Sequence, residues 1–470
     1  MIFNSTTFLV FFAIVYVLYW LANKHLKLQN GLLLLASYVF YGWWDWRFLS
    51  LIFISSLIDY YAALKMEQKP EQSKRWLMVS LVYNLGMLSI FKYYNFFASS
   101  FTDMTRMFGW EPNDLTLNII LPVGISFYTF QTLSYTIDVY RKNLKPTKDL
   151  LAFLTYIAFF PQLVAGPIER ASSLLIQVEH RRVFRKDWFN EGIVQIFVGL
   201  FRKVVIADTL GIYVDAVYGD IGINNSASIL LATVLYAFQI YYDFAGYSDI
   251  AIGTAKMMGF RFCQNFNLPY FSKSLTEFWR KWHMSLSYWL RDYLYISLGG
   301  NRKGIKITYR NLMLTMLLGG LWHGSSWNFI IWGGIHGLFL SIEKYTMNKS
   351  WFSAIRKWSL PAYVYTFGVV VFSWIFFRAQ SLDMAFMAIS KIVHFEWVMP
   401  YFEDINIMVN TFTVLGLGLM IDFYLYRKEI PLETLGAGYS PLKISIIISL
   451  LLVLISLFYS TSNNFIYFQF

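Results

Sequence analysis

The stretch LLGGLWHGSSWNF, residues 317–329, places a histidine, His323, inside a long apolar run with glycines on both sides. A titratable side chain is costly inside a bilayer, so an intramembrane histidine is by default a functional candidate. A basic and aromatic segment, FSKSLTEFWRKWHMSLSYWLRDYLYISLGGNRKG (residues 271–304), lies directly upstream and carries His283. We expect the two segments to form one site within a membrane.

The composition of the whole chain is that of an all-α polytopic membrane protein. Hydrophobic residues make up 57% and charged residues 14% of the 470 residues, and the charged fraction is about half the usual one. Apolar runs of about twenty residues recur along the chain, as membrane-spanning helices require. We expect one integral-membrane domain over residues 1–470. Its ten predicted spans are residues 7–22, 30–45, 48–64, 76–92, 118–139, 191–213, 228–256, 361–378, 407–425 and 443–460.

The formal net charge of +11 does not indicate nucleic-acid binding. Most of the excess lies in short loops between apolar runs, as the positive-inside rule predicts for cytoplasmic loops. The basic loops hold Lys65–Arg75, Arg141–Lys148 and the segment 169–203, whereas loops near Asp103, Asp215 and Glu403 are acidic on balance. Placing the basic loops in the cytoplasm gives a consistent alternation with both termini outside.

Two apolar segments do not fit this alternation as single spans. Residues 151–165 lie between two basic loops and are short, and residues 311–343 lie between Arg302–Arg310 and Lys344–Lys357. A segment that leaves and returns on one side is a re-entrant hairpin, tolerated where protein buries it or where it lines a cavity. We expect His323 near the turn of the second hairpin, although two tightly packed full spans would satisfy the same charge pattern.

Residues 273–293 read as one amphipathic helix. Phe278, Leu286 and Trp289 recur at helical spacing. At about 100° per residue, Arg280 and Arg291 would lie about 20° apart on one side. Such a helix would lie at the membrane interface and extend its basic groups into lipid headgroups. Alternatively, it would line the cytoplasmic entrance of the site, bind a polyanion there and turn His283 inward.

His323 is the candidate for acid–base chemistry. Burial favours the neutral imidazole, which takes a proton from a hydroxyl or thiol near neutral pH. We interpret His336, in WGGIHG, as structural. The sequence has one cysteine and neither an HExxH motif nor an acidic pair at metal-ligand spacing, so no metal is expected. Asp243 and Asp249, in YYDFAGYSDIAIG, are intramembrane carboxylates with more than one possible role. They would either serve as ion sites in a transporter, or pair with an arginine or orient a histidine.

Three blocks carry a resemblance to a known family. They are DFAGYSDIAIG (residues 243–253), the segment 259–304 with its FWRKWHMSLSYWLRDYLYISLGGNR core, and LLGGLWHGSSWNFIIWGGIHG (residues 317–337). The chain resembles the membrane-bound O-acyltransferase (MBOAT) family, most closely its alginate O-acetylation subgroup, from ASYVFYGWWDWRFL near the start to NFIYFQF at the end. The resemblance implies an MBOAT-like ring of about ten spanning helices, plus re-entrant helices, around a central tunnel. It places the family's essential histidine at His323 and its second histidine at His283.

The resemblance also implies a function. The protein would transfer an acyl group, which the resemblance indicates is acetyl, from cytoplasmic acetyl-CoA toward an extracytoplasmic polysaccharide. A partner transferase would complete the transfer. The protein would lie in the inner membrane of a bacterial cell. Charge-assisted hydrogen bonds would hold the phosphates of CoA; the residues concerned are Arg280, Lys281, Arg291, Arg302 and Lys303. His323 would act as general base and His283 would position donor or acceptor. The alternatives are a transporter that uses Asp243 and Asp249, and a scaffold in which His323 has no chemical role.

Overall fold

The computed structural model describes residues 1–113, 115–164, 166–346, 359–459 and 465–466. Regular secondary structure within these ranges is helical throughout, which confirms the all-α prediction. The chain forms two compact units: residues 1–189 with 254–263, and residues 190–253 with 264–470. Helices α10 and α12 cross the boundary in sequence, and each unit is described by itself.

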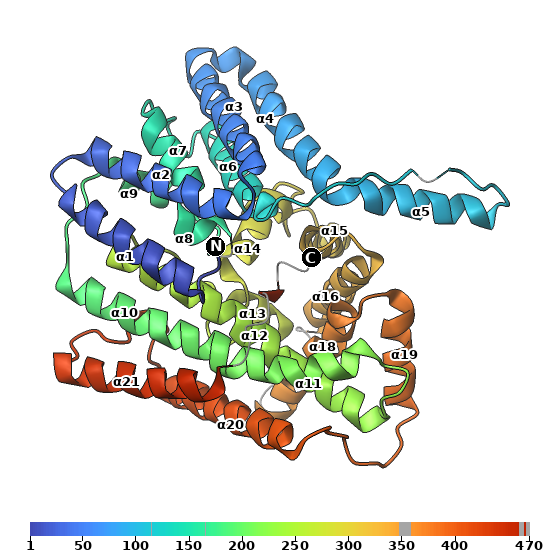
Figure 1. Cartoon of the computed structure of the whole chain (residues 1–470). Coiled ribbons are helices and arrows are strands. Elements are labelled where there is room, and N and C mark those ends of the chain that lie inside the picture. Colours follow the sequence, from blue (N-terminus) through green and yellow to red (C-terminus); the bar gives the residue numbers. More distant parts are fainter. Residues whose placement is uncertain (114, 165, 347–358, 460–464, 467–470) are drawn as a thin grey trace. The chain divides into compact units, whose positions relative to one another are not determined.

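The first unit consists of the N-terminal helices, in which α3 packs against both α4 and α6, and α2 packs against α7. Figure 1 shows α3 and α4 side by side. The helices are α1 (Thr6–Leu21), α2 (Leu26–Asp45), η1 (Trp46–Phe48), α3 (Leu49–Gln68), η2 (Pro70–Gln72), α4 (Ser73–Leu88), the π-helical turn η3 (Ser89–Tyr93), α5 (Tyr94–Met107), α6 (Ile125–Tyr140), α7 (Leu150–Ala158), α8 (Phe160–Leu163) and α9 (Leu174–Glu179).

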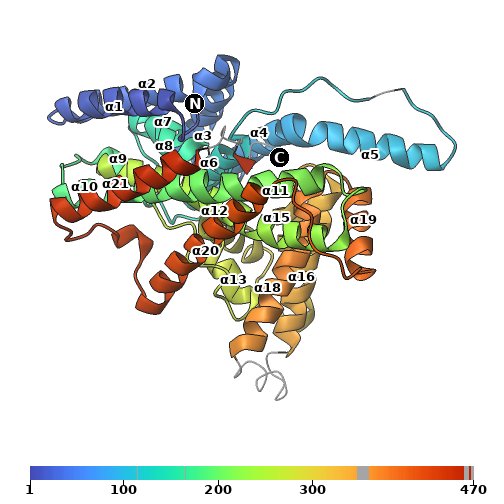
Figure 2. The ribbon, with the colours of Figure 1, turned by 60° about the horizontal axis from the view of Figure 1, so that its bottom comes forward.

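The second unit carries both predicted histidines. In it α16 packs against α15, α18 and α13, as Figure 2 lets the reader follow for α16 and α18. Its helices are α10 (Lys186–Leu200), the π-helical turn η4 (Phe201–Ala207), α11 (Asp208–Gly219), α12 (Ser226–Met257), α13 (Leu275–Lys281), α14 (Met284–Trp289), the π-helical turn η5 (Leu290–Tyr295), α15 (Ile305–His323), α16 (Trp327–Thr346), α18 (Ser359–Arg378), α19 (Leu382–Val393), α20 (Ile405–Lys428), η6 (Leu432–Thr434) and α21 (Pro441–Phe458).

Each of the ten predicted spans overlaps helical structure, but the first seven residues of the predicted span 118–139 precede α6 and are not helical. By length and composition, six helical stretches in the described part of the chain are able to cross a membrane. They are Leu26–Gln68, Pro70–Met107, Ser226–Met257, Leu360–Arg378, Ile405–Lys428 and Pro441–Phe458. The stretch Leu26–Gln68 is 43 residues long and contains two predicted spans. The predicted spans 7–22, 118–139 and 191–213 are not among the six. Helix α1, over the first of them, has only 16 residues, and the last holds the charged pair Arg202 and Lys203 in η4.

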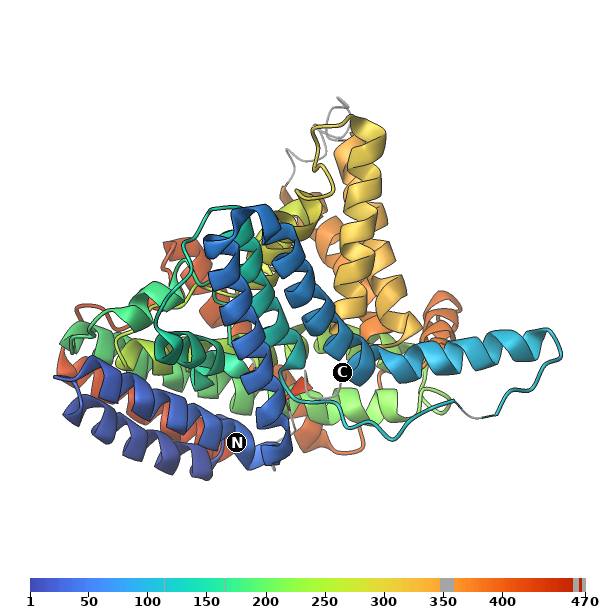
Figure 3. The ribbon, with the colours of Figure 1, turned by 90° about the horizontal axis from the view of Figure 1, so that it is seen from above.

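Residues 311–343 form a helical hairpin. Its arms, α15 with 19 residues and α16 with 20, are also long enough for the alternative of two packed full spans, so re-entry remains a prediction. Helices α15 and α16 lie side by side, and the chain turns between His323 and Trp327 (Figure 3). A Cβ atom on Gly320 would collide with the carbonyl oxygen of Phe329, so this glycine allows the two backbones to approach. Of the basic stretch predicted after the hairpin, residues 347–358 lie outside the described residues.

The predicted re-entrant segment 151–165 is divided into α7 and α8. Helix α7 has nine residues, or about 14 Å of helix, which is less than half the thickness of a hydrocarbon core. Pro161 lies in the first turn of α8, where its missing N–H costs nothing. A short broken segment of this kind agrees with the prediction that residues 151–165 are no ordinary span.

The prediction of one amphipathic helix over 273–293 is wrong. Helix α13 ends at Lys281 and α14 begins at Met284, and between them His283 adopts a left-handed backbone conformation with φ 42°. Beyond α14 the chain continues as the π-helical turn η5. Arg280 and Arg291 therefore do not share one regular helix, and their predicted 20° separation does not apply.

Candidate active site

His323 is the last residue of α15 and is 4% exposed. Three aromatic rings pack around its imidazole, with centroid distances of 5.0 Å to Trp322, 5.1 Å to Trp332 and 5.5 Å to Phe377. These rings come from α15, α16 and α18, so the site depends on the packing of three helices. The arrangement holds a titratable ring in surroundings of low polarity.

His283 lies beside His323. The centroids of the two imidazole rings are 6.3 Å apart, and the ring of Trp322 contacts both. His283 is fully buried. A left-handed conformation costs a residue with a side chain about 1–2 kcal/mol, and such strain tends to occur at functional sites. The two histidines that the sequence singled out therefore share one site.

Asn265 holds His283 and was missed by the sequence analysis. Its side-chain oxygen Oδ1 lies 3.1 Å from Nδ1 of His283 and accepts a hydrogen bond of 2.9 Å from the hydroxyl of Ser285. Its amide nitrogen donates to the hydroxyl of Ser248, at 3.1 Å. Burial lowers the pKa of His283, which lies outside the six candidate spans, to about 3. This imidazole is therefore neutral at physiological pH.

The five cations proposed for CoA fall into two groups. Lys281 pairs with Glu277 at 2.7 Å, and Arg291 pairs with Asp292 at 2.6 Å. Exposed Arg280, Arg302 and Lys303 form no ion pair with another described residue. Arg302 and Lys303 come just before α15, at the end of that helix opposite His323.

Asp249 pairs with an arginine, as one of the alternatives proposed. Arg202 donates to Asp249 at 2.8 Å and to Asp422 of α20 at 3.0 Å. Gln195 donates a further hydrogen bond of 3.2 Å to Asp249. Tyr242 donates to Asp422 at 2.9 Å. The charged side chains in this buried network are paired with one another and join η4, α12 and α20.

Asp243 is engaged in the same way by a lysine. Lys203 lies 2.6 Å from Asp243 and 2.7 Å from Asp208. The backbone N–H of Ile466 also donates to Asp243, at 2.9 Å. The two carboxylates in the DFAGYSDIAIG block are thus held by neighbouring cations of η4, 40 or more residues earlier in the chain.

His336 is held on both ring nitrogens, as its structural interpretation predicts. The indole N–H of Trp279 donates to Nδ1 at 3.3 Å, so Nδ1 is the unprotonated nitrogen. Nε2 therefore carries the proton and donates to the hydroxyl of Ser373 at 2.9 Å. The ring of Trp332 packs between His336 and His323, with centroids 4.9 Å and 5.1 Å away.

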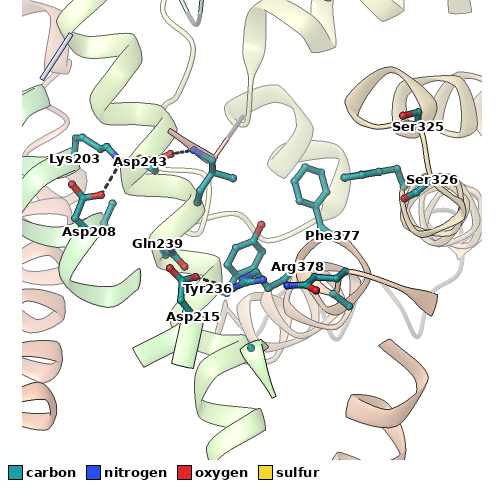
Figure 4. A pocket seen from close by; sticks show the side chains of 16 residues that line it. Lys203, Asp208, Asp215, Tyr236, Gln239, Asp243, Ser325, Ser326, Phe377 and Arg378 are labelled. Atoms are coloured by element: carbon teal, nitrogen blue, oxygen red, sulfur yellow. Dashed lines mark hydrogen bonds and ion pairs between the residues drawn. The ribbon is translucent and has the colours of Figure 1, made fainter. Parts of the chain in front are cut away.

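A cavity of about 670 Å³ lies next to the histidine site. Ser325 and Ser326, two and three residues after His323, line it together with Phe377, whose ring packs against His323. Figure 4 shows polar side chains opposite the serines, among them Lys203, Asp243 and Gln239. The cavity therefore has a polar wall and an aromatic wall, as a site for a hydroxyl-bearing ligand requires.

The sequence model of the MBOAT, membrane-bound O-acyltransferase family matches residues 42–389. The chain belongs to this family. Over 498 residues it is 40% identical to a protein of Pseudomonas putida named probable alginate O-acetylase AlgI, covering 100% of both chains. The protein of the same name from Pseudomonas aeruginosa is 43% identical over 430 residues, 90% of this chain and 80% of the relative.

A relative with a different name has a related activity. The peptidoglycan O-acetyltransferase of Helicobacter pylori is 37% identical over 399 residues, 77% of this chain and 73% of the relative. The family match contains His283, His323 and the hairpin between α15 and α16. The chain is therefore a multi-pass membrane O-acyltransferase with bacterial relatives, which confirms the resemblance seen in its motifs.

Proposed function

We propose that this enzyme transfers an acetyl group from acetyl-CoA to a hydroxyl on the way to an extracytoplasmic polysaccharide, with His323 as general base. The observation that carries the proposal is the pair of buried imidazoles, 6.3 Å apart, beside a polar cavity. Relatives named for alginate and peptidoglycan acetylation support the acyl group and the class of final acceptor.

The chemistry needs one proton acceptor near the hydroxyl. A ring nitrogen of His323 takes the proton as the hydroxyl oxygen attacks the thioester carbonyl. The new C–O bond forms, the C–S bond breaks, and the proton returns to the departing sulfur as the thiol of CoA. A positioned general base of this kind contributes about 10²–10⁴-fold to the rate.

The donor would enter from the basic end of α15. Arg302 and Lys303 are exposed there, and backbone N–H groups at the start of a helix favour anions such as phosphate. Arg280 is exposed in the last turn of α13 and would contribute a further positive charge. Helix α15 has 19 residues, so His323 lies about 28 Å further along the axis. The pantetheine arm of CoA would run along the hairpin toward the histidines. Lys281 and Arg291 are paired with carboxylates, so they would contribute less to binding of the CoA phosphates.

The family match also motivates a proposal about the wider architecture. We propose that the two units together form one membrane domain over residues 1–470, with a ring of helices around a central tunnel. The family match supports this because residues 42–389 include parts of both units. In this arrangement the basic loops are cytoplasmic and the protein resides in the bacterial inner membrane.

The acceptor would approach from the opposite side. Asp215 and Arg378 line the cavity next to His323, and Asp215 belongs to a loop predicted to be extracytoplasmic. The predicted extracytoplasmic loops are short and acidic, so they offer little surface for an anionic polysaccharide. We propose that a partner transferase takes the acyl group and completes the transfer to the sugar.

The transporter alternative would use Asp243 and Asp249 as ion sites. Both are engaged by Lys203 and Arg202, so neither offers an open carboxylate for a moving cation. The scaffold alternative makes a different prediction, namely that substitution of His323 leaves acetylation unchanged.

Reconstitution in vesicles tests the function. Acetyl-CoA is supplied only on the side that exposes residues 302–304, which labelling of an introduced cysteine identifies. The proposal predicts release of CoA thiol on that side and acetylation on the other side only when an extracytoplasmic transferase is added. Efficient acetylation of a polysaccharide by the purified protein alone would refute the proposal that a partner transferase is needed. An absence of thiol release would refute the proposal that acetyl-CoA is the donor.

A further inference from the structure

Asn265 is fully buried in the loop between α12 and α13, and its side-chain amide has a defined orientation. The backbone N–H of Ser285 lies 3.4 Å from Oδ1 and its hydroxyl lies 2.9 Å from the same atom. A backbone N–H donates and never accepts, so the atom that faces Ser285 is the amide oxygen. The amide nitrogen is turned to Ser248, and the backbone carbonyl of Asn265 accepts from the N–H of Met284 at 2.8 Å.

This orientation decides which nitrogen of His283 carries a proton. Nδ1 lies 3.1 Å from the same Oδ1. An amide oxygen only accepts hydrogen bonds, so Nδ1 is the protonated nitrogen. In a neutral imidazole the other nitrogen, Nε2, then holds a lone pair and acts as an acceptor.

We propose that Asn265 is a positioning residue that fixes His283 as an acceptor at Nε2, ready to receive a hydrogen bond from an O–H or N–H of the substrates. The inference rests on the proposed function, because acyl transfer supplies these donors: the hydroxyl of the acyl acceptor, or an amide N–H in the pantetheine arm of acetyl-CoA. His283 would thereby orient one substrate beside His323, whose ring is 6.3 Å away.

The surroundings of His283 suit this role. The rings of Phe244 from α12, Phe266, Trp322 and His323 face it. His323 is the titratable group among these rings. Burial lowers the pKa of His283, so the lone pair on Nε2 is retained through the physiological range. The left-handed backbone at His283 places the ring between α13 and α14, where the Met284 and Ser285 N–H groups meet Asn265.

The state of the ring is measurable without any reaction. Full-length protein in lipid nanodiscs, with ¹⁵N-labelled histidine, contains six histidines, and a His283→Gln variant identifies the signals of His283. We expect the pattern of an imidazole protonated on Nδ1 in the wild type and a mixture of tautomers in Asn265→Ala. Asn267→Ala, at an exposed asparagine two positions away, is the control and should match the wild type. A wild-type proton on Nε2, or an unchanged pattern in Asn265→Ala, would overturn the assignment.

A second variant tests the consequence for catalysis. Asn265→Asp keeps an acceptor at Nδ1 but adds a negative charge, which raises the pKa of His283. Below that raised pKa the imidazolium has no lone pair, so the rate of acetyl transfer by the variant should fall as the pH falls. The pH–rate profile of the wild type should show no such decline caused by His283. A profile that coincides with the wild type would reduce Asn265 to a structural residue.

The same assay separates the two substrates. A rise in KM for acetyl-CoA in Asn265→Leu would identify the pantetheine N–H as the donor, and a fall in kcat at unchanged KM would identify the acceptor hydroxyl. Unchanged KM and kcat would overturn the proposal. A protein that shows the Nδ1 tautomer but releases no CoA thiol would refute the proposed function and leave the tautomer assignment standing.

Discussion

The second unit buries two polar regions of opposite character. Around η4, Arg202 and Lys203 each lie between two aspartates, so every charge has a close partner. Around the turn of the hairpin, His283 and His323 lie among aromatic rings instead. The sequence marks the histidines and the aspartates of DFAGYSDIAIG as polar groups in apolar surroundings. It assigned Arg202 and Lys203 to a basic loop, and that assignment is wrong, because both are buried in η4.

The difference teaches how a buried polar group can be interpreted. A carboxylate held by a cation is expensive to disturb, because removing the cation leaves a charge without compensation. A neutral imidazole in an aromatic environment can gain and lose a proton while the helices around it stay in place. We therefore assign structure to the η4 network and chemistry to the histidine pair.

The largest effect is expected for His323. His323→Ala should lower acetylation by about 10²–10⁴-fold, because the general base is lost. His336→Gln is the matched control, since His336 lies on the same hairpin and bonds Ser373 and Trp279 instead. It should change the rate per folded molecule by less than about tenfold. Equal losses in both variants, measured as acetyl groups per protein, would abolish the distinction between the two histidines.

The next effect concerns Arg202. Arg202→Met should destabilise the protein by about 3–5 kcal/mol, because Asp249 and Asp422 remain buried without their cation. Combining it with Asp249→Asn and Asp422→Asn removes the charges together and should recover much of the loss. Thermal unfolding in nanodiscs measures both. If the triple variant is as unstable as the single one, charge compensation is not what the network provides.

A smaller effect is expected for the exposed cations proposed to bind CoA. Arg280→Gln with Arg302→Gln should raise KM for acetyl-CoA about tenfold, since each guanidinium contributes about 1.5–3 kcal/mol to a charged hydrogen bond before solvent screening. Lys281→Gln with Arg291→Gln removes the same formal charge but only residues with carboxylate partners. A similar rise in KM for acetyl-CoA in both double variants would indicate that the overall positive charge attracts the donor, without a specific phosphate site.

The smallest effect is expected for the surface pair Lys281–Glu277. It joins partly exposed side chains four residues apart. Lys281→Gln should lower the free energy of unfolding by only about 0.2–1 kcal/mol. Denaturant unfolding checks this value, and a loss as large as that of Arg202→Met would mean that exposed pairs matter as much as buried ones.

Much of this could be predicted from the sequence. The all-α class followed from apolar runs of span length, and the hairpin followed from basic stretches on both sides of residues 311–343. The pairing of His283 with His323 was expected because both lie in adjacent motifs. These are properties of local composition and charge order, which a single sequence contains.

The rest depends on tertiary contacts. No glycine or proline marks the break between α13 and α14 in FWRKWHMSL, so helical periodicity predicted one helix through His283. Asn265 precedes His283 by 18 residues, and its role became visible only where the loop folds back onto α14. In the same way, Asp249 pairs with Arg202, which lies 47 residues earlier in the chain. The sequence alone therefore did not identify the partner of Asp249.

The most direct test of the central claim is the release of CoA thiol from acetyl-CoA by protein in nanodiscs, with an acceptor present and with rates expressed per mole of folded protein. Wild type, His323→Gln and the triple variant Arg202→Met with Asp249→Asn and Asp422→Asn are compared side by side. The account predicts that His323→Gln releases thiol at least about 10²-fold more slowly, while the triple variant retains a rate close to that of the wild type. A full rate in His323→Gln together with a lost rate in the triple variant would place the chemistry in the η4 network and contradict the account.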